Sequence, residues 1–155
     1  MAYVVTGLSP EPFRTLFGLS DAELAERGVI RKTVDAKPGF PCRVTLEDAE
    51  VGETVLLMNH TSHAVETPYR SAYAIYVREG QEEPARLEDE LPAVFQNRPI
   101  AFRVFNAEGM LIGAELALPG GAEAAIERGF ARDGAAYLHA HNAAHGCYSA
   151  RVDRA

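Results

Sequence analysis

Short segments of apolar or alternating apolar and polar residues follow one another along most of this chain. After residue 28 they cover residues 29–34, 43–46, 54–60, 71–78, 100–106, 110–118, 136–141 and 147–152. Each has the length of a β-strand, and residues that favour turns separate them, as in Lys37-Pro-Gly-Phe-Pro41 and Pro119-Gly-Gly121. The pattern therefore predicts a mostly antiparallel β protein.

Helical signals are few and short. Ser20 and Glu23 form a capping box, in which the Ser20 hydroxyl accepts a hydrogen bond from the backbone N–H of Glu23. The helix predicted at 21–27 ends at Gly28, a residue that adopts the left-handed conformation easily. Further helical turns are expected at 11–17, 92–96 and 122–132. The predicted class is α+β, with a mostly antiparallel sheet and two or three short helices packed on one face.

Size and composition narrow the function classes. The 155 residues suit a single domain spanning 1–155. The net charge is −7, and no basic stripe is present, so we expect no nucleic-acid partner. No apolar run approaches the roughly 20 residues that span a bilayer, and no signal peptide is recognisable, so we expect a cytoplasmic protein without a membrane partner. The acidic run at 79–90 is interpreted as a solvated loop. Homo-oligomerisation stays open.

The C-terminal segment carries the densest candidate chemistry. Strand alternation places Tyr137, His139 and His141 on one face of a predicted hairpin, while Leu138 and Ala140 point toward the core. A connection through 142–146 predicts the cross-strand pairs His141 with Cys147, His139 with Ser149, and Tyr137 with Arg151. This register also puts Tyr148 on the apolar face, together with Ala150 and Val152. A slip by one residue would change every pair.

One hypothesis for this face is a metal site. Two histidines two residues apart and a nearby thiolate are competent ligands for Zn²⁺ or another late divalent ion. The candidate ligands are His139, His141, Cys147 and His60, with His63 completing the set if that strand end lies alongside. The alternative is that the histidines line a groove without an ion.

A second hypothesis is covalent catalysis. Cys147 beside His141 would form a Cys–His dyad, in which the imidazole activates the thiol. The backbone N–H near Gly146 would serve as an oxyanion donor, and Asp153 would be the third group. A pair of Ser149 and His139 is an equally available construction. The alternative explanation for these cysteine and serine residues is that they are small, inert residues of a strand. The other cysteine, Cys42, is expected to be a free thiol.

A third hypothesis is an anion-binding pocket. Arginine side chains bind carboxylate or phosphate through two parallel hydrogen bonds. The candidate ligand-binding residues are Arg43, Arg70, Tyr69, His139, His141, Asn142 and Arg151. The alternative is internal pairing of these arginines with Glu47, Asp48, Glu66 or Asp153.

Several long motifs resemble one known family. They are residues 35–49, which contain Pro41-Cys42-Arg43, then Thr67-Pro-Tyr-Arg70, and then residues 137–155 with His139-Ala-His-Asn142. The resemblance is to the bacterial family DUF1203, and it extends from residue 7 to the C-terminus. It implies a small single-domain protein, assigns no activity and defines no catalytic residue.

Together these observations favour a protein that binds a small anionic ligand in an Arg/His-lined pocket. The expected walls are the C-terminal hairpin, the Pro41-Cys42-Arg43 strand and the 59–70 loop. The alternatives are a hydrolase or transferase that uses a metal-bound water or Cys147, and a structural or interaction domain without a small ligand.

Overall fold

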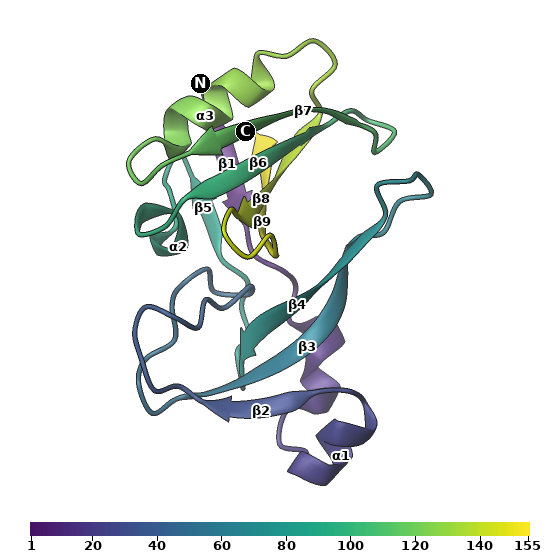
Figure 1. Cartoon of the computed structure of the whole chain (residues 1–155), viewed down its shortest axis with the longest axis vertical. Coiled ribbons are helices and arrows are strands. Elements are labelled where there is room, and N and C mark those ends of the chain that lie inside the picture. The colour runs from purple at the N-terminus through teal and green to yellow at the C-terminus, as the bar shows by residue number, and fades with distance from the viewer.

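Two antiparallel sheets, arranged one above the other along the long axis, make up the computed structural model, which describes residues 1–155 (Figure 1). The larger sheet has the strand order β5-β1-β9-β8-β6-β7, and the smaller one has the order β2-β3-β4. The strands of the larger sheet are β1 (Tyr3–Thr6), β5 (Arg86–Glu88), β6 (Ile100–Phe105), β7 (Leu111–Ala117), β8 (Tyr137–Asn142) and β9 (Tyr148–Arg154). Those of the smaller sheet are β2 (Ile30–Thr33), β3 (Thr54–His63) and β4 (Ser71–Arg78).

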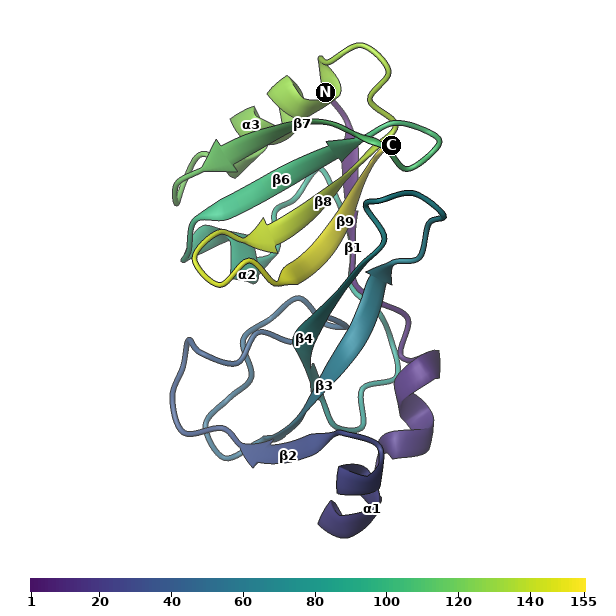
Figure 2. The ribbon, with the colours of Figure 1, turned by 45° about the vertical axis from the view of Figure 1, so that its right-hand side comes forward.

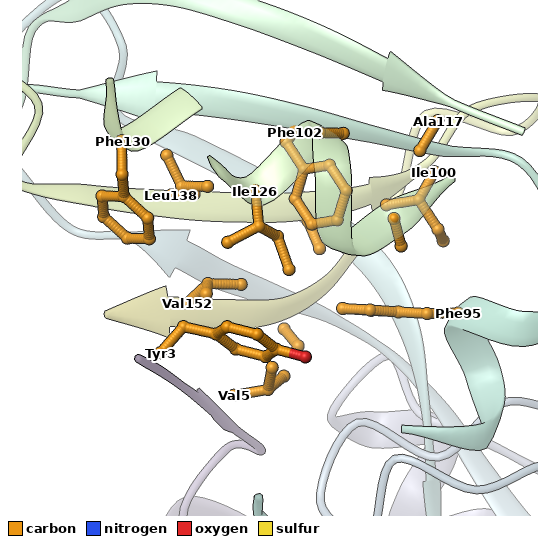
Figure 3. Packing of buried hydrophobic residues seen from close by; sticks show 14 of the residues in the cluster. Tyr3, Val5, Phe95, Ile100, Phe102, Ala117, Ile126, Phe130, Leu138 and Val152 are labelled. Carbon is orange, nitrogen blue, oxygen red and sulfur yellow. The ribbon is translucent and has the colours of Figure 1, made fainter. Parts of the chain in front are cut away.

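One face of the larger sheet packs against two helices, α2 (Ala93–Gln96) and α3 (Ala122–Phe130). Ile126 and Phe130 of α3 lie over Leu138 and Val152, which point from β8 and β9 into the same core (Figure 3). Because these side chains are at alternate positions, the opposite face of the hairpin is free to meet the smaller sheet. The prediction that Leu138 and Ala140 point toward the core is confirmed.

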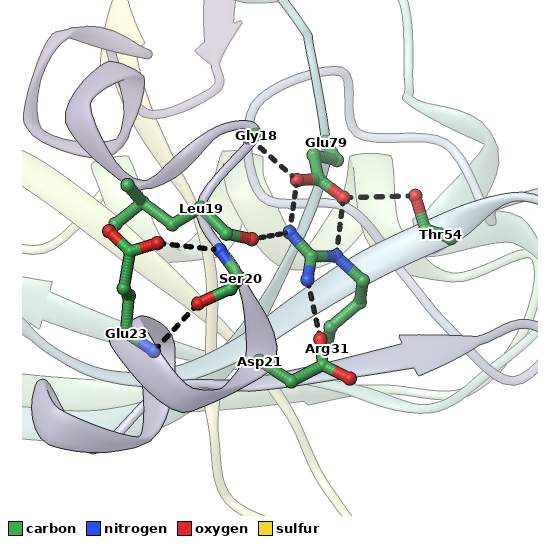
Figure 4. Close-up of polar contacts among 8 residues, drawn as sticks. All are labelled: Gly18, Leu19, Ser20, Asp21, Glu23, Arg31, Thr54 and Glu79. Carbon is green, nitrogen blue, oxygen red and sulfur yellow. Dashed lines mark hydrogen bonds and ion pairs between the residues drawn. The ribbon is translucent and has the colours of Figure 1, made fainter.

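The smaller sheet has its own helical cover, from the 3-10 helix η1 (Glu11–Leu16) and the helix α1 (Asp21–Glu26). The predicted capping box at Ser20 is present, and Gly28 has a positive φ of 71°. Beside the capping box, Arg31 of β2 donates to both carboxylate oxygens of Glu79, to Asp21 and to the Leu19 carbonyl (Figure 4). These bonds fasten α1 and β2 to the end of β4.

The segment at 43–46 is not the predicted strand. It forms a turn, in which the Leu46 N–H donates to the Cys42 carbonyl at 3.0 Å, and Leu46 has a positive φ of 57°. Leu46 packs in the core of the larger sheet, whereas Cys42 and Val44 pack in that of the smaller one. A regular strand could not place Leu46 in one core and Val44 in the other, because alternate side chains of a strand lie on the same face. The loop therefore connects the two halves.

Two short strands were not predicted from the sequence. β1 begins near the N-terminus, and β5 lies inside the acidic run that was interpreted as a solvated loop. β5 pairs with β1 at the edge of the sheet, where Val5 opposes the half-buried Leu87. Such a strand is hard to predict from the sequence, because exposed charged residues surround its one apolar side chain. The α+β class is confirmed, with the short helices divided between the two sheets. None of the helices is long and apolar enough to cross a membrane.

Candidate functional site

The C-terminal hairpin has a different register from the predicted one. His139 opposes Arg151, and His141 opposes Tyr148, with a bulge between Ala140 and His141. The turn causes the shift, because the Gly146 N–H donates to the Asn142 carbonyl at 2.7 Å and shortens the connection. The three pairs predicted for this hairpin are therefore wrong.

The bulge places Tyr148 on the same face as the histidines rather than on the apolar face. Its ring lies 5.0 Å from that of His139 and 5.9 Å from that of His141, measured between centroids. A bulge admits one extra residue on one strand, so the side chains beyond it change face. Tyr148 thus fills the space between the sheets that Cys147 was expected to occupy.

A buried group of histidines and tyrosines, which we call the histidine cluster, joins the two sheets. It consists of His63, Tyr137, His139, His141 and Tyr148. His63 reaches it from the end of β3, and its ring lies 4.8 Å from that of His139. The Nδ1–H of His63 donates to the Tyr69 carbonyl at 2.9 Å, so its Nε2 accepts from the Tyr137 hydroxyl at 2.7 Å. Both ring nitrogens of His63 are occupied.

Burial keeps the hairpin histidines neutral. Removal from water, with a smaller effect of the neighbouring His63, lowers the pKa of His139 to about 3. Burial also lowers the pKa of His141 to about 4, although its Nδ1–H bond to the Gly146 carbonyl acts in the opposite direction. Neither imidazole therefore supplies a positive charge to an anion near neutral pH.

The candidate metal ligands do not converge. His60 packs against Phe13 at a ring distance of 5.3 Å, on the helix-covered side of the smaller sheet, away from His139. No group of three or more His, Cys, Asp or Glu side chains is placed to hold a metal ion. The structure therefore does not assemble the predicted set of His139, His141, Cys147 and His60.

The turn between β8 and β9 faces β4 and the loop that follows β2 (Figure 2). Side chains from these segments line a cleft of about 390 Å³, here called the hairpin cleft. Its walls come from segments far apart in the sequence: Gly39, Pro41, Arg43, Tyr73, Ala74, Tyr76, Asn142, His145 and Cys147. An adjoining cavity of about 230 Å³ shares four of these residues and adds Arg98. Tyr73 also contacts His141, at a ring distance of 5.1 Å, and so separates the cleft from the histidine cluster.

Arg43 is buried at the base of the hairpin cleft, with only 2% of its surface exposed. Its Nε donates to the Tyr148 carbonyl at 2.8 Å, and its Nη1 donates to the Pro41 carbonyl at 2.6 Å. Its Nη2 donates to the Cys147 Sγ at 3.1 Å. Burial lowers the pKa of Arg43, and the nearby Cys147 sulfur acts in the opposite direction. The guanidinium has no carboxylate partner.

The acidic residues that could have neutralised Arg43 are engaged elsewhere. Asp48 pairs with Arg98 at 2.7 Å, and Glu47 lies 3.5 Å from Arg78. Asp153 pairs with Arg151 of its own strand at 2.8 Å, so that internal pairing is the outcome for Arg151. Arg151 also lies over the ring of Tyr137 rather than lining the cleft.

Cys147 is held by two N–H donors rather than by a histidine. Besides Arg43, the Nδ2 of Asn142 donates to the Cys147 Sγ at 3.5 Å. The His141 ring instead donates to the Gly146 carbonyl at 2.9 Å, so the predicted Cys–His dyad is not hydrogen-bonded. The other proposed pair is also absent, because His139 faces Arg151 while Ser149 is buried in the bulge.

The structure brings together Arg43 and Asn142 of the predicted anion-binding set and Cys147 of the other two hypotheses, but it leaves other candidates outside. Arg70 is exposed on the loop between β3 and β4, and Tyr69 contributes its carbonyl to His63. The cleft residues that sequence reasoning missed are Tyr73, Tyr76, His145 and Arg98. The only available signal was the aromatic content of the strand predicted at 71–78, which does not say what that strand faces.

Comparison with known proteins places most of the chain in one family. Residues 39–154 match the family model described as a protein of unknown function, DUF1203. The match contains the loop that carries Arg43, strands β3 and β4 of the smaller sheet and the whole C-terminal hairpin. No curated protein and no solved structure shows significant similarity to the chain. The chain therefore belongs to the DUF1203 family.

Proposed function

We propose that this protein binds a small anionic ligand in the hairpin cleft, with Arg43 as the group that recognises the negative charge. The observation that carries the proposal is a buried guanidinium, at the base of an open cleft, that no carboxylate neutralises. The other twelve arginines are at least partly exposed, so their charges do not raise this question. Arg43 is the single arginine that is fully buried.

The charge of Arg43 favours a bound anion. Burial of an ionised group costs several kcal/mol unless an opposite charge or a full set of hydrogen bonds compensates. A guanidinium has five N–H groups, and three of those of Arg43 are used by the Tyr148 carbonyl, the Pro41 carbonyl and the Cys147 sulfur. Two N–H groups remain for a carboxylate or phosphate oxygen, which accepts charge-assisted bonds.

The surroundings suit a compact polar ligand. A volume of about 390 Å³ lies in the range of small-molecule sites. Tyr73 and Tyr76 offer ring surfaces, and Asn142 lines the cleft with a buried Oδ1 atom that has no hydrogen-bond partner. Arg98 lines the adjoining cavity, where its charge is paired with Asp48. His139 and His141 take no part in this binding, since both are neutral and Tyr73 lies between His141 and the cleft.

Thermal denaturation with a panel of anions tests the proposal. Inorganic phosphate and succinate serve as probes, because each presents paired oxygens to a guanidinium. At about 100 times the dissociation constant, binding stabilises a protein by about 2.7 kcal/mol. For a chain of this length, that corresponds to a rise in Tm of about 5–10 °C. We expect this rise in the wild-type protein with at least one probe.

Two variants and one control make the test specific. Arg43→Met removes the charge, and Asn142→Asp keeps the shape of the side chain while it adds a negative charge to the cleft. Both should abolish the rise in Tm. Arg70→Met is the matched control, because Arg70 is exposed and lies outside the cleft, and it should leave the rise unchanged. No rise with any anion, or an equal rise in Asn142→Asp, would refute the proposal.

A further inference from the structure

We propose that Cys147 is a nucleophile that forms a covalent bond with a small anionic electrophile bound in the hairpin cleft. This inference rests on the proposed function, because Arg43 is the group that holds the anionic part of the electrophile. It goes further by assigning a chemical step to the site and by naming the atom that performs it.

The sulfur of Cys147 accepts hydrogen bonds from two neighbouring side chains. Two N–H donors converge on Sγ, from the Nη2 of Arg43 at 3.1 Å and from the Nδ2 of Asn142 at 3.5 Å. Donors and a positive charge next to a sulfur stabilise the thiolate, which is the reactive form of cysteine. No carboxylate takes part in these bonds. The sulfur is thus held between two N–H donors at the wall of the cleft.

Cys147 is also accessible, in contrast to the other cysteine. It lines the cleft and is half-buried, whereas Cys42 is 1% exposed and packs in the core of the smaller sheet. Gly146, directly before Cys147, has a positive φ of 82°, and no atom lies within 4 Å of the place where a Cβ would stand. The turn that precedes Cys147 is therefore open to solvent on that side.

The side chain of Asn142, beside this sulfur, has an unsatisfied acceptor. Asn142 is 8% exposed, and its buried Oδ1 has no hydrogen-bond partner. An unsatisfied buried acceptor costs about 1–3 kcal/mol, so such an atom calls for a donor. A hydroxyl or protonated group of a ligand in the cleft would supply one. Asn142 and the two free N–H groups of Arg43 therefore offer an acceptor and donors on either side of Cys147.

The proposed step is a nucleophilic attack. The thiolate sulfur attacks the electrophilic carbon, an S–C bond forms, and the bond from that carbon to its leaving group breaks with the electron pair on the leaving group. Nothing is oxidised or reduced overall. The carboxylate or phosphate of the same molecule stays on Arg43, and that binding holds the carbon close to Sγ. Iodoacetate reproduces this step, with iodide as the leaving group.

Iodoacetate and iodoacetamide make a matched pair of probes, since they share the leaving group and differ in charge. The rate of modification at Cys147 is followed by mass spectrometry of its peptide, with Cys42 as the internal reference. We expect Cys147 to react at least about tenfold faster than Cys42, because the sulfur of Cys42 is packed in a core and shielded from the reagent. We also expect iodoacetate to react faster than iodoacetamide at Cys147, and phosphate to slow both.

Asn142→Asp provides the decisive comparison. A negative charge next to the sulfur disfavours the thiolate and should slow both reagents by about tenfold or more. It should also repel iodoacetate, so that iodoacetamide becomes the faster reagent. Arg70→Met should react as the wild-type protein does. Slow modification of Cys147, or equal rates of the two reagents in the wild type, would overturn the inference.

A separate measurement tells this failure from failure of the proposed function. The variant Cys147→Ser removes the nucleophile and keeps Arg43. If phosphate still raises its Tm while the wild-type sulfur is unreactive, the inference is wrong and the anion site stands. If no anion raises the Tm of either protein, the anion site and the inference built on it are both wrong.

Discussion

Acid should destabilise this protein through the histidine cluster, and replacement of His139 measures the effect. His139 is 3% exposed, and its neighbours are His63, His141, Tyr137, Tyr148 and the arginines Arg103 and Arg151. With burial and these neighbours, the pKa of His139 falls to about 3 in the folded protein. The corresponding value in an unfolded chain is about 6.5.

The direction of the effect follows from these two values. The unfolded chain gains a proton as the pH falls through about 6.5, and the folded protein does not gain one until about pH 3. Stability is therefore complete above that upper pKa and decreases below it. Between about pH 7.5 and about pH 5, His139 should remove about 2 kcal/mol from the free energy of unfolding. This figure is insensitive to the folded-state pKa as long as that pKa stays well below 5.

Urea denaturation at the two pH values provides the assay. The variant His139→Gln lacks the titrating ring, so its loss between the two pH values should be smaller than that of the wild type by about 2 kcal/mol. His145→Gln is the control, because His145 is exposed on the same hairpin, and it should lose as much as the wild type. Equal losses in wild type and His139→Gln would refute the reasoning, since the ring would then be protonated without unfolding.

Three further outcomes are expected. A Cβ at Gly7 would stand 2.1 Å from the Val44 carbonyl oxygen, so Gly7→Ala should lower the free energy of unfolding by about 1–3 kcal/mol, and a neutral result in urea would contradict this. Arg31 lowers the pKa of Glu79 to about 2, so Glu79→Gln should cost about 1–2 kcal/mol near neutral pH, and this cost should vanish as the pH falls from about 4.5 toward 2. Leu46→Ala should cost about 2–5 kcal/mol and shift unfolding as one transition, because its loop enters both cores, whereas two separate transitions in calorimetry would count against that coupling.

Some residues of the site were predictable from the sequence, and others were not. The sequence singled out Arg43, Asn142 and Cys147 as chemically competent residues, and these three do meet. It also grouped them with His139 and His141, which are close in sequence. The bulge separates those histidines from the cleft, because it turns Tyr148 onto their face. A single extra residue in a strand is invisible in a pattern of alternating residues.

Features that depend on residues close together in the chain were predictable from the amino-acid sequence alone. The capping box at Ser20 forms because Glu23 is three residues away, and β4 and α3 appear where alternation and helical periodicity predicted them. The core face of β8 was also predictable, since Leu138 and Ala140 alternate with polar residues. In each of these elements, a pattern within a few neighbouring residues was sufficient to predict the conformation.

Features that depend on contacts between residues far apart in the chain became visible only in the tertiary structure. Residues 43–46 form a turn because Leu46 and Val44 must reach opposite cores. The guanidinium of Arg43 is fixed by the Tyr148 carbonyl, which is 105 residues away along the chain. The cleft exists because that loop, β4 and the C-terminal turn come together. Such contacts depend on how the two sheets pack, and no local pattern of side chains encodes that packing.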